Sequence, residues 1–442
     1  MSFFRQAQTL PRLKPLSFKR PTIVTVLDVG SSKTVCLIGR LTPLTGAELL
    51  SQRSHKVEII GIGHQKSRGI KAGVIMDLEK VESSIRMAVD TAERMAGVTV
   101  DSLIVNVTAG RLKSEIYTAS VDLSGKEIIH SDLSKVVDLV TRRTVTQERS
   151  ILHSLPTSYA LDGERGISDP TGMFGDKLGV DLHVLSADRS PLKNLELCIN
   201  RAHLTVEAMV ATPYASGLAS LVADEAEMGC AAVDLGGGTT TISVFSEGKF
   251  IFADAIALGG HHVTMDLARG LTTRFEDAER IKVMHGSALP SACDDRDVIS
   301  IPPIGDGQND HPAQVSKAMV ARIVRARVEE TLELVRDRIQ QSGYASIVGK
   351  RVVLTGGASQ LTGLADSARR ILARNVRIGR PLGVSGLPAA VKGPAFSAAA
   401  GLMIYPQVAH YEAHGSSSPM MLAADGTSGR LARMGHWFKE SF

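Results

Sequence analysis

Two short segments, one in each half of the chain, share a pattern that strongly constrains the fold. They are residues 26–34 (VLDVGSSKT) and residues 233–240 (VDLGGGTT). In each, a β-rich stretch ends near an aspartate and runs into a glycine turn with hydroxyl residues. β-branched and apolar residues follow each turn, so each turn joins two strands, where a P-loop or dinucleotide fingerprint would begin a helix. The pattern predicts two phosphate-binding β-hairpins that hold one nucleotide between two related domains.

The residue types in these turns suit a nucleotide phosphate. Glycine lets backbone N–H groups approach an anion closely, and successive N–H groups with neighbouring hydroxyls form an anion-binding nest. The expected phosphate ligands are Gly30, Ser31, Ser32, Lys33, Gly236, Gly237, Gly238, Thr239 and Thr240. Lys33 would supply a point charge for the terminal phosphates. We expect Asp28 and Asp234 to lie near Mg²⁺ and to hold it through water, because this ion dehydrates reluctantly.

Two further segments extend the predicted site. Residues 351–359 (RVVLTGGAS) read as a strand that ends in Gly356 and Gly357, with Ser359 before a helix that begins near residue 360. Glu279 and Lys282 stand three residues apart and therefore share one helix face. They could contact a ribose or an adenine edge, although such a pair by itself is more often a surface ion pair.

The order of these motifs resembles the superfamily of actin, hexokinase and the heat-shock chaperones. Within it the chain resembles the FtsA family of actin-like bacterial cell-division proteins, most specifically in residues 177–184 (KLGVDLHV), residues 225–230 (EAEMGC) and the C-terminal segment. The resemblance covers roughly residues 21–405 and that segment. It implies an α/β, actin-like two-domain ATPase fold with an inserted subdomain, a C-terminal amphipathic helix, and ATP with Mg²⁺ as ligands.

The organisation of the chain is expected to follow that plan. At 442 residues it is too long for one core, and its net charge of +4 is too small to indicate nucleic acid binding. Four cysteines without paired spacing indicate reduced thiols, and no apolar run reaches transmembrane length. We expect a first domain (21–108 and 186–225) with an inserted small subdomain (109–185), and a second domain that returns to the first (226–257 and 346–405). The second domain should carry a smaller nucleotide- and partner-binding subdomain (258–345) with a polar insertion (287–312). Outside the domains we expect a flexible basic arm (1–20), a flexible linker (406–429) and an amphipathic helix (430–442).

A long helix is predicted over residues 314–340. Apolar residues recur every three or four positions and form one seam, namely Val320, Val324, Val328, Leu332, Val335 and Ile339. Beside this seam lie Arg322, Arg325 and Arg327. They read either as a solvated helix face or as a docking site for an acidic peptide. The resemblance implies the second, because FtsA binds the acidic C-terminal tail of FtsZ on this smaller subdomain.

The C-terminal segment has the pattern of a membrane-surface helix. A polar tether (406–429) precedes residues 430–442, which on a helix place Leu431, Met434, Phe438 and Phe442 on one face with Trp437 beside them, and Arg430, Arg433 and Lys439 on the other. Bulky apolar anchors opposite basic residues are typical of interfacial helices. The alternative is a terminal helix docked on the protein's own core, and the length of the polar tether argues against it.

The function follows from these features and the resemblance together. We expect an ATP-binding protein that tethers FtsZ filaments to the cytoplasmic face of the inner membrane at the division septum, self-associates into actin-like filaments and recruits later division proteins. Residues 210–216 (VATPYAS) lack the Glu or Gln with which polymerising relatives orient the attacking water, so we expect at most a weak ATPase. The alternatives are a kinase on the same fold and an actin-like protein of pilus assembly or cell shape.

Overall fold

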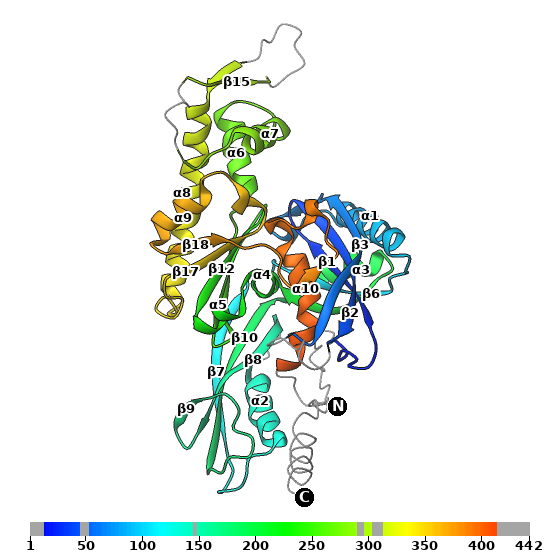
Figure 1. Cartoon of the computed structure of the whole chain (residues 1–442), viewed down its shortest axis with the longest axis vertical. Helices are drawn as coiled ribbons and strands as arrows, with labels where there is room; N and C mark the ends of the chain where they lie inside the picture. The colour runs from blue at the N-terminus through cyan, green and yellow to red at the C-terminus, as the bar shows by residue number, and fades with distance from the viewer. Residues whose placement is uncertain (1–12, 45–52, 145–147, 290–295, 303–312, 413–442) are drawn as a thin grey trace, which may run out of the picture.

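The computed structural model describes residues 13–44, 53–144, 148–289, 296–302 and 313–412. Two domains lie side by side, with a smaller subdomain at the upper end of one and an inserted subdomain below them (Figure 1). The predicted amphipathic helix at 430–442 and Cys293 lie outside these ranges. Within the described ranges, no helix is both long and apolar enough to cross a lipid bilayer.

The first domain is built on a six-stranded sheet with the order β11-β6-β1-β2-β3-β19. β1 and β2 form an antiparallel hairpin, and β6 lies parallel to β1 on its other side. Its strands are β1 (Thr22–Val29), β2 (Lys33–Pro43), β3 (His55–Lys66), β6 (Ser102–Val107), β11 (Thr205–Ala211) and β19 (Val384–Ser385). Also present are a short hairpin of β4 (Ile70–Lys71) and β5 (Val74–Ile75), and the helices α1 (Leu78–Ala96) and α3 (Arg189–Arg201).

The second domain repeats this arrangement in a five-stranded sheet with the order β14-β13-β12-β17-β18. β12 and β13 form the second hairpin, and β17 lies parallel to β12 as β6 does to β1. The elements are β12 (Cys230–Leu235), β13 (Thr240–Ser246), β14 (Lys249–Ile256), β17 (Arg351–Thr355), β18 (Asn375–Ile378), α5 (Ala223–Met228) and α9 (Leu364–Leu372). The two predicted hairpins are therefore present, one in each domain.

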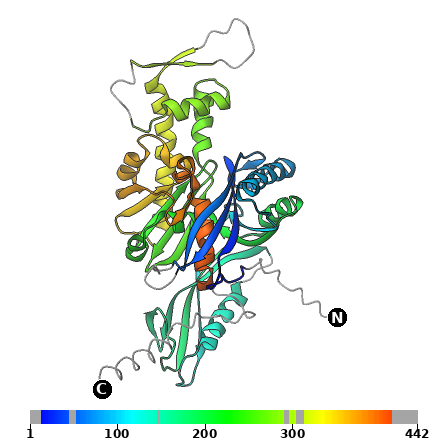
Figure 2. The same cartoon turned by 45° about the vertical axis from the view of Figure 1, so that its right-hand side comes forward.

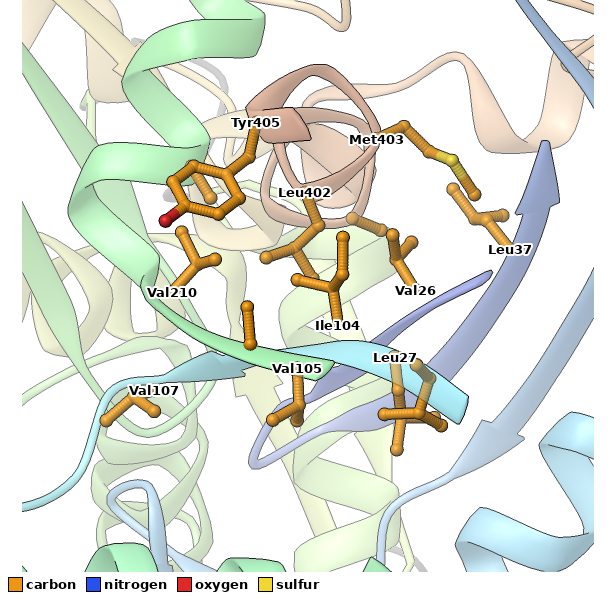
Figure 3. Packing of buried hydrophobic residues seen from close by; sticks show 14 of the residues in the cluster. Val26, Leu27, Leu37, Ile104, Val105, Val107, Val210, Leu402, Met403 and Tyr405 are labelled. Carbon is orange, nitrogen blue, oxygen red and sulfur yellow. The ribbon is translucent and has the colours of Figure 1, made fainter. Parts of the chain in front are cut away.

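Two helices pack against each other where the domains meet. They are α4 (Thr212–Ser220) and α10 (Ser397–Val408), and α10 runs between the two sheets in Figure 2. A side chain at Gly401 would overlap the carbonyl of Ala215, so glycine permits this close approach. Leu402 and Met403 pack among residues of β1, β2 and β6 (Figure 3). The chain thus returns to the first domain through the 3-10 turns η3 (Ala389–Val391) and η4 (Pro394–Phe396), and η5 (Ala409–Tyr411) follows α10.

The structure corrects two expected boundaries. The linker does not begin at residue 406, because Pro406, Gln407 and Val408 are buried in the last turn of α10. The flexible basic arm does not extend to residue 20 either. Leu13 and Leu16 pack against the core of the first domain, so residues 13–20 have a defined place on its surface. Both segments carry many polar residues, and sequence composition did not reveal the few apolar contacts that hold them.

The inserted subdomain is a four-stranded antiparallel sheet with the order β7-β10-β8-β9, covered by one helix. Its elements are β7 (Lys113–Asp122), α2 (His130–Thr144), β8 (Arg149–Leu161), β9 (Glu164–Ile167) and β10 (Lys177–Asp188). It has a small core of its own, which includes Val136 and Val140 of α2 and Leu178 and Leu182 of β10. A separate core of this kind marks an independently packed layer of the molecule.

The smaller subdomain at the upper end consists of α6 (Gly260–Gly270), α7 (Phe275–His285), α8 (Lys317–Gln341) and a two-stranded sheet of β15 (Val298–Ile301) and β16 (Ala313–Ser316). All six residues of the predicted apolar seam on α8 are buried. The helix begins later than predicted because residues 313–316 pair as β16, and Ser316 caps it by accepting from the Met319 N–H.

Candidate nucleotide-binding site

A cavity of about 470 Å³ lies between the two domains, and both predicted turns open into it. The turns are closed in the same way, since the Gly30 N–H donates to the Lys33 carbonyl at 3.0 Å and the Gly236 N–H to the Thr239 carbonyl at 2.9 Å. Most of the predicted ligands line this one cavity, namely Asp28, Gly30, Ser31, Ser32, Lys33, Asp234, Gly236, Gly237, Gly238, Thr239, Glu279, Lys282, Gly356 and Gly357.

The two turns approach each other closely, which explains the glycines of the second one. A Cβ atom on Gly238 would lie 2.5 Å from Ser31 Oγ, and one on Gly237 would lie 2.9 Å from Ser32 Cβ. No side chain fits between the turns at this separation. The glycines therefore keep this end of the cavity open, and Ser31 and Ser32 line it.

Two buried carboxylates and one partly buried ammonium lie at this end. Burial raises the pKa of Asp28 to about 6, with Lys33 opposing the shift, and it raises the pKa of Asp234 to about 7, with the charge of Asp28 adding to the effect. Burial lowers the pKa of Lys33 to about 8, against the two aspartates. Two carboxylates facing one cation leave a shortage of positive charge.

The residues present suit Mg²⁺ held jointly with phosphates. The described residues contain no group of three His, Cys, Asp or Glu side chains that could hold a metal ion by itself. Asp28 and Asp234 offer hard oxygen donors, and Mg²⁺ commonly takes one or two carboxylates with water and phosphate oxygens as its other ligands. The adjacent His261 and His262 give no metal site either, because His262 Nδ1 accepts from the Gly259 N–H at 3.1 Å.

Lys282, predicted to contact a ribose or an adenine edge, has three hydrogen-bond partners within the protein. Its Nζ donates to Glu279 Oε2 at 2.7 Å, to Thr264 Oγ1 at 2.9 Å and to the Gly260 carbonyl at 3.1 Å, which occupies all three of its donors. It therefore positions Glu279, and hydrogen bonds from Lys282 and Thr264 outweigh burial and lower the pKa of Glu279. Glu279 remains a charged acceptor at the rim of the cavity. Beyond it the lining turns apolar, with Val283, Val328, Leu332, Leu361 and Leu364.

Two predicted ligands do not line the cavity. The Thr240 hydroxyl donates to the Leu258 carbonyl at 2.9 Å, and the Ser359 hydroxyl donates to the Gly356 carbonyl at 2.7 Å. Both side chains are buried and committed to the framework. A hydroxyl residue beside a glycine turn serves equally well as a ligand or as a backbone cap, and the sequence does not distinguish the two.

The structure adds a network that the sequence analysis missed. Asn106 at the end of β6 donates from Nδ2 to Asp28 Oδ1 at 2.7 Å and to Thr212 Oγ1 at 3.1 Å, and its Oδ1 accepts from the Val29 N–H at 2.7 Å. The hydroxyls of Thr108 and Thr212 lie 2.6 Å apart. All three side chains line the cavity. Single polar residues at strand and helix ends carry little signal, and only the pairing of β6 with β1 on one side and β11 on the other brings them together.

The arginines of α8 differ in how far the fold engages them. Arg327 donates to Asp266 of α6 at 2.6 and 3.1 Å and to Glu330 at 2.6 Å, so it ties two helices together. Arg325 lies 2.9 Å from Glu329, one helical turn away. Arg322 is exposed and has no ion pair within the described part of the chain. Of the three predicted partner residues, Arg327 is the one already committed to the structure.

Comparison with known proteins decides the family. A model for "Cell division protein FtsA" matches residues 231–401, and one for the "SHS2 domain inserted in FTSA" matches residues 109–186. The chain is 68% identical to the cell division protein FtsA of Agrobacterium fabrum over the full length of both. The chain belongs to the FtsA family. It is 33% identical to FtsA of Pseudomonas aeruginosa over 86% of this chain and 88% of that protein, and 30% identical to FtsA of Escherichia coli over 95% and 98%.

Solved structures of other proteins share the actin-like fold. A PilM–PilN type IV pilus biogenesis complex matches with a TM-score of 0.58 and 15% identity, covering 87% of this chain and 98% of that chain. MreB5 of Spiroplasma citri bound to ADP matches with a TM-score of 0.51 and 12% identity, covering 89% and 98%. At these identities the likeness shows the fold alone. The predicted fold class is confirmed, an α/β actin-like architecture of two domains with an inserted subdomain.

Proposed function

We propose that this FtsA-family protein binds ATP with Mg²⁺ in the cavity between its two domains. The observation that carries the proposal is the pair of matching hairpins whose turns open into one cavity, with Lys33, Asp28 and Asp234 at the same end. Backbone N–H groups and Lys33 would bind the phosphates, and the aspartates would hold the ion through water. MreB5, which has the same fold, was solved with ADP.

The test is Gly237→Val, which puts a branched side chain between the two turns. We expect this variant to lose measurable ATP binding in calorimetry while keeping its melting temperature within a few degrees. Ser120→Val on the exposed edge of β7 introduces the same residue far from the cavity and should bind ATP as the wild type does. Unchanged affinity in Gly237→Val would overturn the site.

We also propose that the site turns over slowly. On the segment from residue 210 to residue 216 the side chain that lines the cavity is Thr212, whose hydroxyl cannot take a proton from water as a carboxylate can. We expect hydrolysis below about 1 s⁻¹, the lower end of typical enzyme turnover. Faster phosphate release by pure protein would contradict this proposal.

The structure leaves two of the three predicted partner residues, Arg322 and Arg325, as the proposed contacts for a partner peptide. As a member of a cell-division family, the chain is proposed to bind the acidic C-terminal tail of FtsZ at Arg322 and Arg325 of α8, where the guanidinium groups are exposed. Arg322→Glu and Arg325→Glu should weaken binding of that peptide, and high salt should reduce the difference by screening. Arg336→Glu is the matched control on the same helix, where Asp337 pairs with the arginine. Equal affinity in all variants would place the site elsewhere.

The membrane proposal rests on the sequence of residues 430–442, which lie outside the described ranges. On vesicles with anionic lipid, the emission of Trp437 should shift to the blue, because amphipathic aromatic side chains prefer the headgroup region. Phe438→Glu should abolish the shift, whereas His436→Glu adds the same charge on the opposite helix face and should keep most of it. A Trp437 that emits as a buried residue without lipid would identify a docked helix instead.

These parts combine into one role. The protein would tether FtsZ filaments to the cytoplasmic face of the inner membrane at the septum, self-associate into actin-like filaments and recruit later division proteins. Membership of a cell-division family favours this role over a kinase or a pilus-assembly or cell-shape function. One tail binds weakly, and several tails on one filament would bind far more firmly through their effective concentration. Localisation of the full chain in dividing cells tests the role as a whole.

A further inference from the structure

Residues 13–20 form a defined surface element on the first domain, at the place where the chain leaves the core for its C-terminal segment. Leu13 and Leu16 pack against the core, and the Ser17 carbonyl accepts from His55 Nε2 at 3.1 Å. The same histidine donates its backbone N–H to Gln407 Oε1 of α10 at 3.0 Å. His55 thus joins the N-terminal segment to the last helix of the core.

The C-terminal segment starts close to this junction. Glu412 comes five positions after Gln407, and helical rise spans roughly 8 Å over that length. Glu412 is buried and its Oε1 lies 2.8 Å from His153 Nδ1, which holds the end of the core in place. Whatever the C-terminal residues bind, residues 13–20 lie near the root of that segment.

The outer side of residues 13–20 is basic and aromatic. Lys14, Lys19 and Arg20 are exposed and form no ion pair within the described residues. Phe18, which lies between them in the sequence, is 63% exposed, and the centroid of its ring is 5.5 Å from that of the His55 ring. An aromatic ring held out in water among unpaired cations is the chemistry of an interfacial membrane contact.

We propose that residues 13–20 are a second membrane-contact element, with Phe18 at the headgroup boundary and Lys14, Lys19 and Arg20 on anionic lipid headgroups. The proposal extends the proposed membrane role of the C-terminal helix and rests on it for the orientation of the molecule. Each basic residue near an anionic surface is worth roughly a fivefold gain in affinity, so the three together contribute on the order of 100-fold. The element would turn this face of the first domain toward the bilayer.

Co-sedimentation of the full chain with vesicles tests the element. A triple variant, Lys14→Glu with Lys19→Glu and Arg20→Glu, should bind vesicles containing phosphatidylglycerol on the order of 100-fold more weakly than the wild type. On neutral phosphatidylcholine vesicles the two should differ little. The matched control reverses the exposed Lys126, Lys193 and Lys350, which lie on other elements, and should bind as the wild type. Equal loss in the control, or no loss in the triple variant, would overturn the proposal.

A second measurement follows Phe18 itself. Phe18→Trp in a Trp437→Phe background should show a blue shift on anionic vesicles and quenching by brominated lipid, and ATP affinity should be unchanged as evidence of folding. Constant emission would overturn the element. The Phe438→Glu variant separates the two proposals. If it binds vesicles normally while the triple variant does not, the proposal for the C-terminal helix is wrong and the proposal for residues 13–20 is supported.

Discussion

The hairpin of β1 and β2 and the hairpin of β12 and β13 share a backbone plan but carry different chemistry. Lys33 in the first turn corresponds to Thr239 in the second, and Ser31 and Ser32 correspond to Gly237 and Gly238. Where the turns meet, the serines of one face the glycines of the other. The first turn thus carries the charged and hydroxyl side chains, whereas the glycines of the second turn leave room for them. Symmetry of the backbone does not make the site symmetric.

The aspartates before the two turns differ in the same way. Asp28 accepts from the amide of Asn106, which β6 places beside it. Asp234 has no such amide partner in the described structure, and its pKa is raised further, to about 7 compared with about 6. Both carboxylates have a side-chain partner in the protein, the Asn106 amide for Asp28 and the Ser216 hydroxyl for Asp234, so they differ in the kind of group that positions them.

The largest effect is expected from moving bulk into the open turn. Gly238→Ala places a Cβ 2.5 Å from Ser31 Oγ, and overpacking of about 1–3 kcal/mol should weaken ATP binding by roughly 10- to 100-fold. Adding Ser31→Gly should restore much of the affinity, because it removes the serine side chain that the new Cβ would overlap. Calorimetric titration measures both. A double variant no better than the single one would show that the turns do not interlock.

Removing the charge of the first turn should have the next largest effect. Lys33→Met should lower ATP affinity roughly 10-fold, because hydrogen bonds to charged groups contribute about 1.5–3 kcal/mol. Thr239→Val, at the corresponding position of the second turn, should change it by less than about threefold. The same titration applies. Equal losses in the two variants would mean that the turns share the phosphate contacts evenly.

The buried carboxylates should make the ligand-free protein less stable as pH rises. Their folded-state pKa values lie above the unfolded values, so the unfolded chain binds fewer protons between about pH 4 and 7 and the free energy of unfolding falls over that range. Asp234→Asn should remove about 1–2 kcal/mol of this loss at pH 8, and Asp28→Asn somewhat less. Thermal melts in EDTA without nucleotide measure it. If the melting temperature of the wild type rose with pH and those of the two variants did not, the pKa values of Asp28 and Asp234 would be lowered in the folded state, contrary to the prediction.

The smallest effect is expected at the threonines that follow the turns. Thr34 lies 2.9 Å from Ser67 Oγ and Thr240 donates to the Leu258 carbonyl, so in both hairpins this hydroxyl serves the framework. Thr34→Ser and Thr240→Ser keep the hydroxyl and should change ATP affinity less than about twofold while lowering the melting temperature slightly. A tenfold loss of affinity in either variant would show that its hydroxyl contacts the nucleotide.

Local pattern was enough to predict the two hairpins, the apolar seam of α8 and most of the turn residues that line the cavity. Turn glycines and the spacing of apolar residues are signals that extend over only a few positions, so they can be recognised in a single sequence. Helix α1 shows how local such signals are: Asp77 caps its start, and Gly97 ends it with a positive φ.

Only the tertiary structure decided which polar side chains reach the cavity. Asn106 and Thr212 enter it because β6 and β11 pair beside β1, while Thr240 and Ser359 turn away and Lys282 is held by Thr264 and Glu279. It also decided that Leu13 and Leu16 pack against the core of the first domain and that Pro406, Gln407 and Val408 are buried in α10. The physical reason is that a hydroxyl or an ammonium takes whichever partner the fold brings within about 3 Å, and that partner is commonly far away in the chain.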